Sequence, residues 1–216
     1  MGSPIDGSLP PGATPLTPEE QEGLIPSIQT REELNEFEAA NIDAATLWAL
    51  RRGRRSAQRK ITTVGGVLDL HRRMFDQTWK WAGQIRRTDK TIGVSKEHIR
   101  EQLQALCGDV QYQIAERAYP LDELAIRYHH RLVSIHPFPN GNGRLGRLAS
   151  DVLISRVGGE PFSWGSSSLD TAGPSRSEYI QALHDADGGN ISGLLKFARS
   201  TTAVQRPPPR VNRTRG

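Results

Sequence analysis

The stretch HPFPNGNGRLGR, residues 136–147, decides the fold and the site of this chain. Apolar residues recur at helical spacing before it, from Leu121 to Ile135, and again after it, from Leu145 to Leu153. We therefore expect the stretch to be a loop that joins two helices. The same spacing, with capping residues such as Thr30 followed by Glu33, predicts helices over most of the remaining chain.

The second half of the stretch is typical of an anion site. Gly141 and Gly143 have no Cβ, so the backbone can turn sharply and a ligand can approach its N–H groups. A helix is expected to begin near Gly143, with unpaired N–H groups and a positive dipole end. Arg144 and Arg147 lie on its first turns, where each guanidinium can form bidentate hydrogen bonds to phosphate oxygens. Cations are unfavourable at this end of a helix unless an anion offsets them, so a polyphosphate ligand is predicted.

His136 is the candidate general base, because an imidazole titrates near neutral pH. The alternative is a histidine that only caps the preceding helix beside a glycine turn. The complete stretch favours the catalytic interpretation, since a structural turn requires neither both arginines nor Asn142.

The stretch resembles the signature of the Fic family, written HPFx(D/E/N)GNGRxxR, and every fixed position is filled. Further resemblance, over roughly residues 14–202, is closest to a bacterial branch called mobile mystery protein B. It implies an all-α fold of the Fic type with a small β-hairpin flap over the active site. The additional blocks that carry it are Trp79–Gly83 with Arg86, Ile92–Val94, Arg127–Leu132 and Phe162–Gly165.

The resemblance implies a protein adenylyltransferase, which moves AMP from ATP to a Ser, Thr or Tyr hydroxyl of a target protein. His136 would deprotonate the hydroxyl, which attacks the α-phosphate while pyrophosphate leaves. Phe138 would anchor the loop in the core. The Gly-Asn-Gly of this chain differs from the Ala-Asn-Lys of the kinase branch and so argues against phosphorylation. The implied nucleotide-binding residues are Asn140, Gly141, Asn142, Gly143, Arg144 and Arg147.

Asn140 departs from many active members, which carry Asp or Glu there as a ligand of Mg²⁺. An amide oxygen can still ligate a hard cation but adds no charge. We therefore expect Mg²⁺ to be bound through Asn140 with more reliance on the phosphates themselves.

Residues Gln84 to Val94 are Thr-rich and partly alternating, with Asp89-Lys90 as a turn signal. In Fic-like proteins this position is the flap. Its edge, at Thr91, Ile92, Gly93 and Val94, would hold a target segment by main-chain hydrogen bonds. The alternative is an ordinary surface hairpin.

Residues 14–26 are expected to contain a short helix that begins at Thr17-Pro18. Family members are often inhibited by a helix with the pattern (S/T)xxxE(G/N), whose glutamate pairs with the second motif arginine. Glu22-Gly23 approximates this pattern one residue too late after Thr17, so Glu22 is the inhibitory candidate toward Arg147, with Glu20 in reserve. The alternative is an acidic first turn that the helix dipole favours.

Three segments are expected: a disordered stretch at 1–13, the Fic domain at 14–202 and a flexible, basic, Pro-rich tail at 203–216. Cys107 is the single cysteine, and no leader or membrane-spanning run is found, which favours a cytoplasmic protein without a membrane partner. The net charge of +4 is concentrated in residues 51–55 and in the tail, so nucleic-acid binding is not expected.

Two other function classes stay open at the level of sequence. One is a non-enzymatic or permanently inhibited nucleotide-binding protein that partners a small, antitoxin-like DNA-binding protein. The other is a Fic enzyme that uses another nucleotide or removes AMP. The sequence predicts neither the target nor the oligomeric state.

Overall fold

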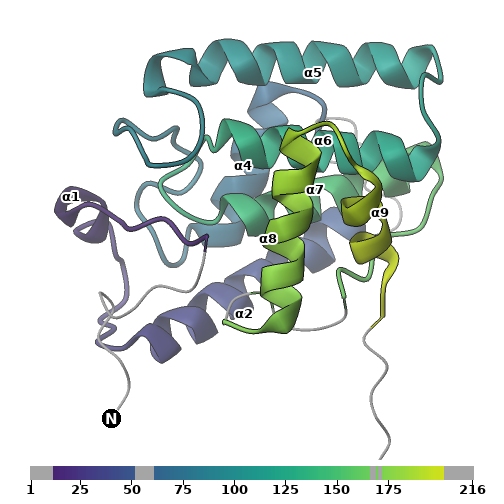
Figure 1. The fold of residues 1–216 in the computed structure, drawn as a ribbon. Coiled ribbons are helices and arrows are strands. Elements are labelled where there is room, and N and C mark those ends of the chain that lie inside the picture. Colours follow the sequence, from purple (N-terminus) through teal and green to yellow (C-terminus); the bar gives the residue numbers. More distant parts are fainter. Residues whose placement is uncertain (1–11, 52–60, 166–168, 170–171, 202–216) are drawn as a thin grey trace, which may run out of the picture.

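The computed structural model describes residues 12–51, 61–165, 169 and 172–201. These residues form eight α-helices and one short 3₁₀ helix (Figure 1). The expectations for residues 1–11, for most of the basic run at 51–55 and for the tail lie outside this description. The helices are α1 (Pro18–Gln21), α2 (Arg31–Leu50), α4 (Val64–Phe75), η1 (Lys96–His98), α5 (Ile99–Ala115), α6 (Leu121–Ile135), α7 (Asn142–Val157), α8 (Pro174–Asp187) and α9 (Ser192–Arg199).

Local capping explains where α2 begins. The hydroxyl of Thr30 accepts a hydrogen bond from the N–H of Glu33, and the carboxylate of Glu33 accepts one from the N–H of Thr30. Two N–H groups that the helix itself leaves unpaired are thereby satisfied. Thr17 and Glu20 form the same reciprocal pair at α1, so both predicted caps are confirmed.

The helices α6 and α7 form the centre of the fold, and the predicted loop joins them. Helix α5 packs along α6, while α2 and α4 pack together and contact α7. Gly146 allows the two central helices to approach closely, because a Cβ there would lie 2.7 Å from Cγ2 of Val133. Phe138 is fully buried and anchors the loop in this core, as expected. Burying such a side chain stabilises the fold by about 1.5–3 kcal/mol.

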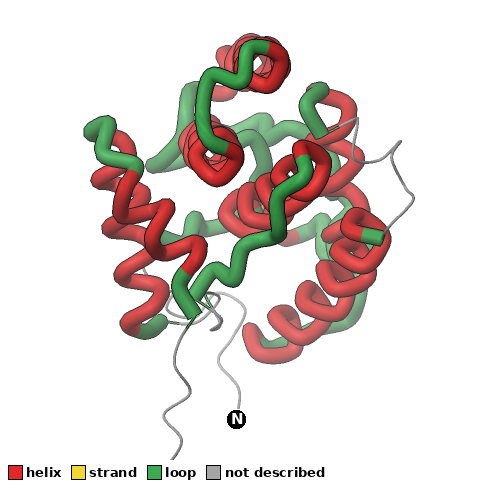
Figure 2. The backbone as a smooth tube through the Cα atoms, turned by 90° about the vertical axis from the view of Figure 1, so that its right-hand side faces the viewer, coloured by secondary structure: helices red, strands yellow, loops and turns green. Residues whose placement is uncertain are grey.

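The predicted β-hairpin is not formed. Residues 84–94 are an irregular loop, and the described residues contain isolated β-bridges but no strand (Figure 2). The loop is folded around one side chain instead of pairing with itself, since the guanidinium of Arg86 donates to the carbonyls of Thr88 and Val94. The all-α class is therefore correct, and its β element is wrong.

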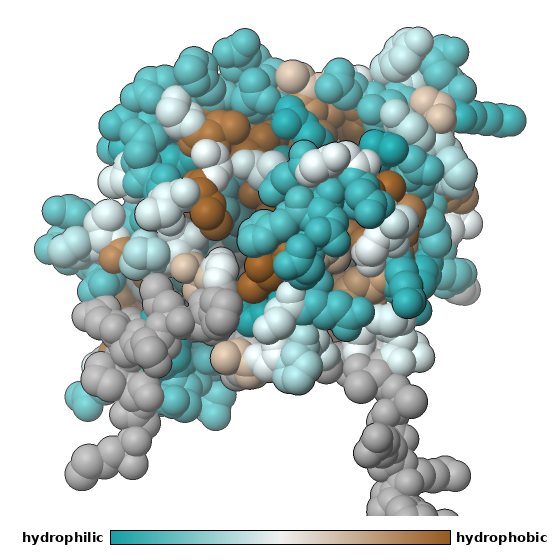
Figure 3. Space-filling model, viewed as in Figure 1, coloured by the Kyte–Doolittle hydropathy of each residue, from teal (hydrophilic) through white to brown (hydrophobic). Residues whose placement is uncertain are grey.

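The packing buries some side chains and leaves others on the surface. Cys107 lies on α5 and is buried. On the face seen in Figure 3, hydrophilic side chains cover α8 and much of α5, and apolar side chains show between them. Among the described helices, none combines the length and apolar character that a bilayer crossing requires.

Candidate active site

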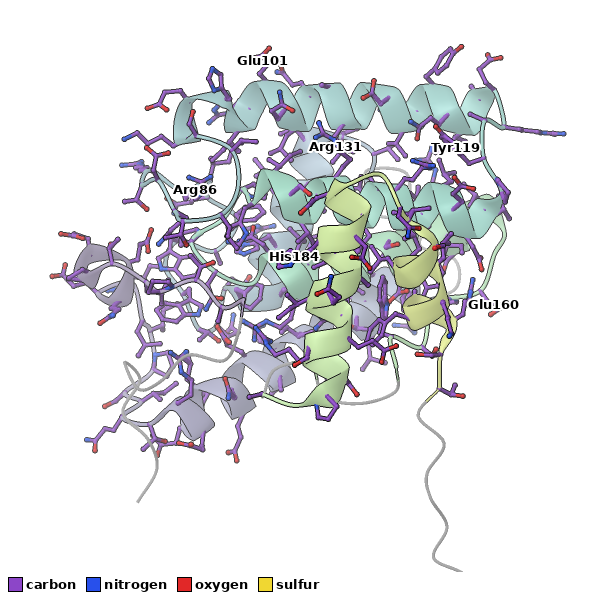
Figure 4. All side chains as sticks on the ribbon, in the orientation of Figure 1. Arg86, Glu101, Tyr119, Arg131, Glu160 and His184 are labelled. Carbon is purple, nitrogen blue, oxygen red and sulfur yellow. The ribbon has the colours of Figure 1, made fainter. Side chains whose placement is uncertain are left out.

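A cavity of about 790 Å³ lies where the α6–α7 loop faces the start of α2 and one side of α8. Its wall includes His136, residues 140–144 and Arg147, so the predicted motif residues are brought together. Residues 92–94 also line it, whereas Thr91 does not. Figure 4 labels Arg86 on the loop beside the end of α6 and His184 on α8, whose side chain lines the cavity.

His136 ends α6 in a left-handed conformation, with φ of 53°. Such a backbone is uncommon for a residue other than glycine and turns the chain abruptly into the loop. Gly93 packs directly against it, since a Cβ on Gly93 would lie 2.5 Å from Cβ of His136. The Nε2 atom of His136 is 3.2 Å from Oγ1 of Thr14. The Nδ1 atom is buried and has no hydrogen-bond partner among the described residues.

The surroundings of His136 keep its imidazole uncharged. Burial, and then the positive charges of Arg86 and Lys90, lower the pKa of His136 to about 4. The ring is therefore neutral at pH 7, and a neutral ring has a nitrogen that can accept a proton. This protonation state is the one that a general base requires.

Arg86 fixes the position of this base by binding the backbone carbonyls of His136 and Pro137. Its Nε donates to the carbonyl of His136 at 2.8 Å, and its own N–H donates to the carbonyl of Pro137 at 3.0 Å. The side chain is almost completely buried, so these bonds form where water cannot compete. The sequence showed Arg86 only as part of a family block and gave it no role.

The motif loop is shaped by its own asparagine. The side chain of Asn142 accepts from the N–H of Phe138 at 3.0 Å and donates to the carbonyl of Phe138 at 2.9 Å. Both ends of this amide thus bind the backbone of Phe138 and shape the loop. The first bond within α7 runs from the N–H of Leu145 to the carbonyl of Gly141. The N–H groups of Asn142 and Gly143 therefore remain at the helix N-terminus for an anion.

His71, on α4, supports the same loop and was missed by the sequence reasoning. Its ring stacks on Phe138, with centroids 3.7 Å apart and planes 8° apart. Its Nδ1 accepts from the N–H of Gly83 at 2.9 Å, so the neutral ring carries its proton on Nε2, which lies 3.1 Å from the carbonyl of Asn140. In the sequence, a histidine on an apolar helix face gives no signal of this role.

The two motif arginines are held on different walls. Arg144 donates to Oε2 of Glu38 at 2.7 Å, and Trp79 donates to Oε1 of the same carboxylate at 2.7 Å. The guanidinium of Arg147 lies over the ring of Tyr179, 5.6 Å from its centroid. Glu38 and Tyr179 come from α2 and α8, and neither was predicted as a site residue.

Asn140 does not fit the role of a protein ligand that holds Mg²⁺ by itself. Its Oδ1 accepts from the N–H of Gly141 at 2.6 Å. The described residues contain no group of three or more His, Cys, Asp or Glu side chains that could hold a metal. A neutral oxygen already bonded to an N–H is a weak ligand for a hard cation, so the loop offers no strong metal site.

The predicted pair between Glu22 and Arg147 is not formed. Glu22 follows α1 as its exposed C-cap residue. The reserve candidate Glu20 is buried, but its carboxylate binds Lys90 at 2.5 Å and Thr88 at 2.7 Å. Helix α1 therefore docks on the 84–94 loop, and its acidic residues do not reach the motif arginines.

Replacing Gly141 with alanine is expected to destabilise the protein by about 1–3 kcal/mol. Gly141 has φ of 79°, and a Cβ there would lie 2.4 Å from the ring of Phe75. Urea unfolding measures the loss. Gly108→Ala in α5 is the matched control, because a Cβ there meets nothing within 4 Å. This control should gain about 0.5–1 kcal/mol. Equal effects of the two substitutions would contradict the close packing at Gly141.

Comparison with known proteins relates this geometry to one family. Residues 61–154 match the sequence profile of the Fic/DOC family. Protein adenylyltransferase fic-1 of Caenorhabditis elegans is 30% identical over 151 residues, which is 67% of this chain and 28% of the nematode protein. Protein adenylyltransferase Fic of Nematostella vectensis is 27% identical over 145 residues, which is 65% of this chain and 32% of that protein. The chain thus spans about a third or less of these relatives.

Solved structures show the same fold. A fragment of C. elegans Fic-1 aligns with a TM-score of 0.59 at 28% identity, covering 83% of this chain and 51% of the fragment. BepC of Bartonella tribocorum, solved with bound AMPPNP, aligns with a TM-score of 0.65 and covers 85% of this chain and 97% of its own. Its identity of 16% supports a likeness in fold alone.

Proposed function

Because residues 61–154 of this chain belong to the Fic/DOC family, we propose that it is a protein adenylyltransferase, which moves AMP from ATP to a Ser, Thr or Tyr hydroxyl of a target protein. One observation carries the proposal. An uncharged, buried histidine, His136, faces the same cavity as the N-terminus of α7 and both motif arginines. A base and an anion cradle thus face one cavity, which supports transfer of a phosphorus-centred group to a hydroxyl.

The geometry of the cavity supports the following roles for these residues. Nε2 of His136 takes the proton of the acceptor hydroxyl, whose oxygen attacks the α-phosphorus while pyrophosphate leaves. The N–H groups at the start of α7, with Arg144 and Arg147, stabilise the negative charge of the leaving phosphates. Because Asn140 offers no strong metal site, we assign no step to a protein-held Mg²⁺.

Three finer features belong to the same proposal. Residues 92–94 line the cavity beside His136, which supports a role for this loop in docking a target segment even though it is no hairpin. The blocks outside the motif support membership in the bacterial branch called mobile mystery protein B. The single buried cysteine supports a cytoplasmic location.

The position of the label in ATP tests the proposed reaction. We expect incubation of the full chain with lysate proteins to transfer label from the α-phosphate of ATP to protein and to release pyrophosphate. Label from the γ-phosphate should appear in pyrophosphate only, because the bond that breaks lies between the α- and β-phosphates. Scintillation counting of precipitated protein, with thin-layer separation of the products, measures both.

Each other outcome points to a different function. Protein labelled from the γ-phosphate would replace the proposal with a kinase. Tight ATP binding without labelled protein or pyrophosphate would favour the non-enzymatic class, including a partner of a small DNA-binding protein. Transfer from another nucleoside triphosphate, but not from ATP, would keep the reaction and change the donor.

A further inference from the structure

The hydroxyl of Thr14 lies against the base of the proposed reaction. Its Oγ1 is 3.2 Å from Nε2 of His136, and the half-buried residue lines the cavity together with Gly12 and Ala13. A general base must be within about 2.6–3.2 Å of the group from which it takes a proton. Thr14 therefore occupies the position that the proposed reaction requires for an acceptor.

Contacts made by the residues that follow Thr14 hold its segment at the cavity. Lys90 donates to the carbonyl of Pro15 at 2.9 Å and pairs with Glu20, and the side chains of Lys90 and Glu20 are only 4% and 10% exposed. Trp81 donates to the carbonyl of Glu20 at 2.8 Å. These contacts fasten residues 15–20 to Trp81 and to the 84–94 loop. Residues 12–14, which precede them, line the cavity.

The other hydroxyls of the cavity wall have different partners. Among the described residues, the wall also carries Ser134 and Tyr179. The hydroxyl of Ser134 donates to the carbonyl of His130 at 2.9 Å, and that of Tyr179 lies 3.0 Å from Nε2 of His129. Neither hydroxyl is bonded to His136, so Thr14 is distinguished from them by its position beside the base.

We propose that Thr14 is a self-modification site, at which the chain places AMP on its own hydroxyl. This inference rests on the proposed function. The Oγ1 atom forms a bond to the α-phosphorus of ATP, and the bond from that phosphorus to the oxygen shared with the β-phosphate breaks. Pyrophosphate leaves, while the hydroxyl proton passes to Nε2 of His136 and then to solvent. Thr14 and an external hydroxyl cannot occupy this position together, so the segment must move aside for another target.

Intact-mass analysis of the full chain after incubation with ATP and Mg²⁺ tests the inference. We expect the wild type to gain the mass of one adenylyl group, with fragmentation placing it on Thr14. Thr14→Ala should lose this addition, and Thr14→Ser, which keeps a hydroxyl, should retain it. Ser27→Ala removes an exposed hydroxyl from the same part of the chain, outside the cavity wall, and should behave as the wild type.

A second measurement separates this inference from the proposed function. Label transfer from the α-phosphate of ATP to lysate proteins should persist in Thr14→Ala, because that hydroxyl is only one acceptor. Such transfer by the wild type without modification of Thr14 would overturn the inference and leave the proposed function intact. No transfer to any protein, including the chain itself, would overturn both.

Mixing variants tests whether the reaction occurs within one molecule. Thr14→Ala serves as an active enzyme without its acceptor, and His136→Asn as an acceptor without its base. We expect the mixture to leave Thr14 of the His136→Asn chain unmodified. We also expect the wild-type fraction modified per unit time to be independent of protein concentration. Modification in the mixture, or a rate that rises with concentration, would overturn the intramolecular reaction.

Discussion

Replacing His136 with alanine or asparagine is expected to lower the rate of AMP transfer by about 10²–10⁴-fold, the usual contribution of a positioned general base. In the proposed function the phosphates are held by the start of α7 and the motif arginines and not by His136, so the affinity for ATP should change little. Asparagine tests the role of the imidazole with less disturbance of the backbone, because asparagine tolerates the left-handed conformation that His136 adopts at φ of 53°. Rates of label transfer and isothermal titration with a non-hydrolysable ATP analogue measure the two quantities.

His98→Ala is the matched control for this prediction. His98 is an exposed histidine in η1, outside the cavity wall, and its loss should leave the transfer rate unchanged. Transfer by His136→Asn at the wild-type rate would contradict a base at this position. A loss of ATP affinity that accounts for the whole loss of rate would instead assign His136 to nucleotide binding.

Acid is expected to destabilise the protein steeply between about pH 6 and pH 5. Burial is the main cause that lowers the pKa values of His71 and His129 to about 3 and that of His136 to about 4. Each histidine therefore takes up a proton in the unfolded chain, below its ordinary pKa of 6.5, but not in the folded one. Burial raises the pKa of Asp151 to about 6, so the folded chain takes up one proton in the same range. Over this range the unfolded state therefore takes up about two protons more than the folded state. The free energy of unfolding should fall by about 3 kcal/mol for each pH unit.

Urea unfolding at pH 7, 6 and 5 measures this dependence. The stabilising contribution of the histidines is complete above pH 6.5 and is lost as the pH falls toward their folded-state values. Asp151→Asn removes the opposing proton uptake and should make the slope steeper, whereas His98→Gln at an exposed position should not change it. A stability that is constant or rises from pH 7 to pH 5 would contradict the neutral burial of these rings.

Local features of the sequence were sufficient to predict the central architecture. The spacing of apolar residues around the motif predicted α6, the loop and α7. The N-cap at Thr17 and the capping box at Thr30 predicted where α1 and α2 begin. These features depend on residues within a few positions of one another. Hydrogen bonds of this range are largely independent of the rest of the fold.

Features that depend on distant contacts were either not predicted or predicted wrongly. Glu38 meets Arg144 across 106 positions, and no local pattern marks such a pair. The turn signal at Asp89-Lys90 suggested a hairpin, but Asp89 accepts from the N–H of Lys96 while Lys90 reaches across to Glu20. Both side chains are thus engaged outside the segment, and the local signal was overridden by tertiary contacts.

The part of the chain that the family profile matches is smaller than the part that forms the site. Residues 61–154 contain the whole motif, yet Arg144 is paired with Glu38 from before this range and Arg147 packs on Tyr179 from after it. A fragment cut to the matched range would keep every signature residue while opening two walls of the cavity. Expression of a minimal unit should therefore include both flanks, from the segment that carries Thr14 through α9.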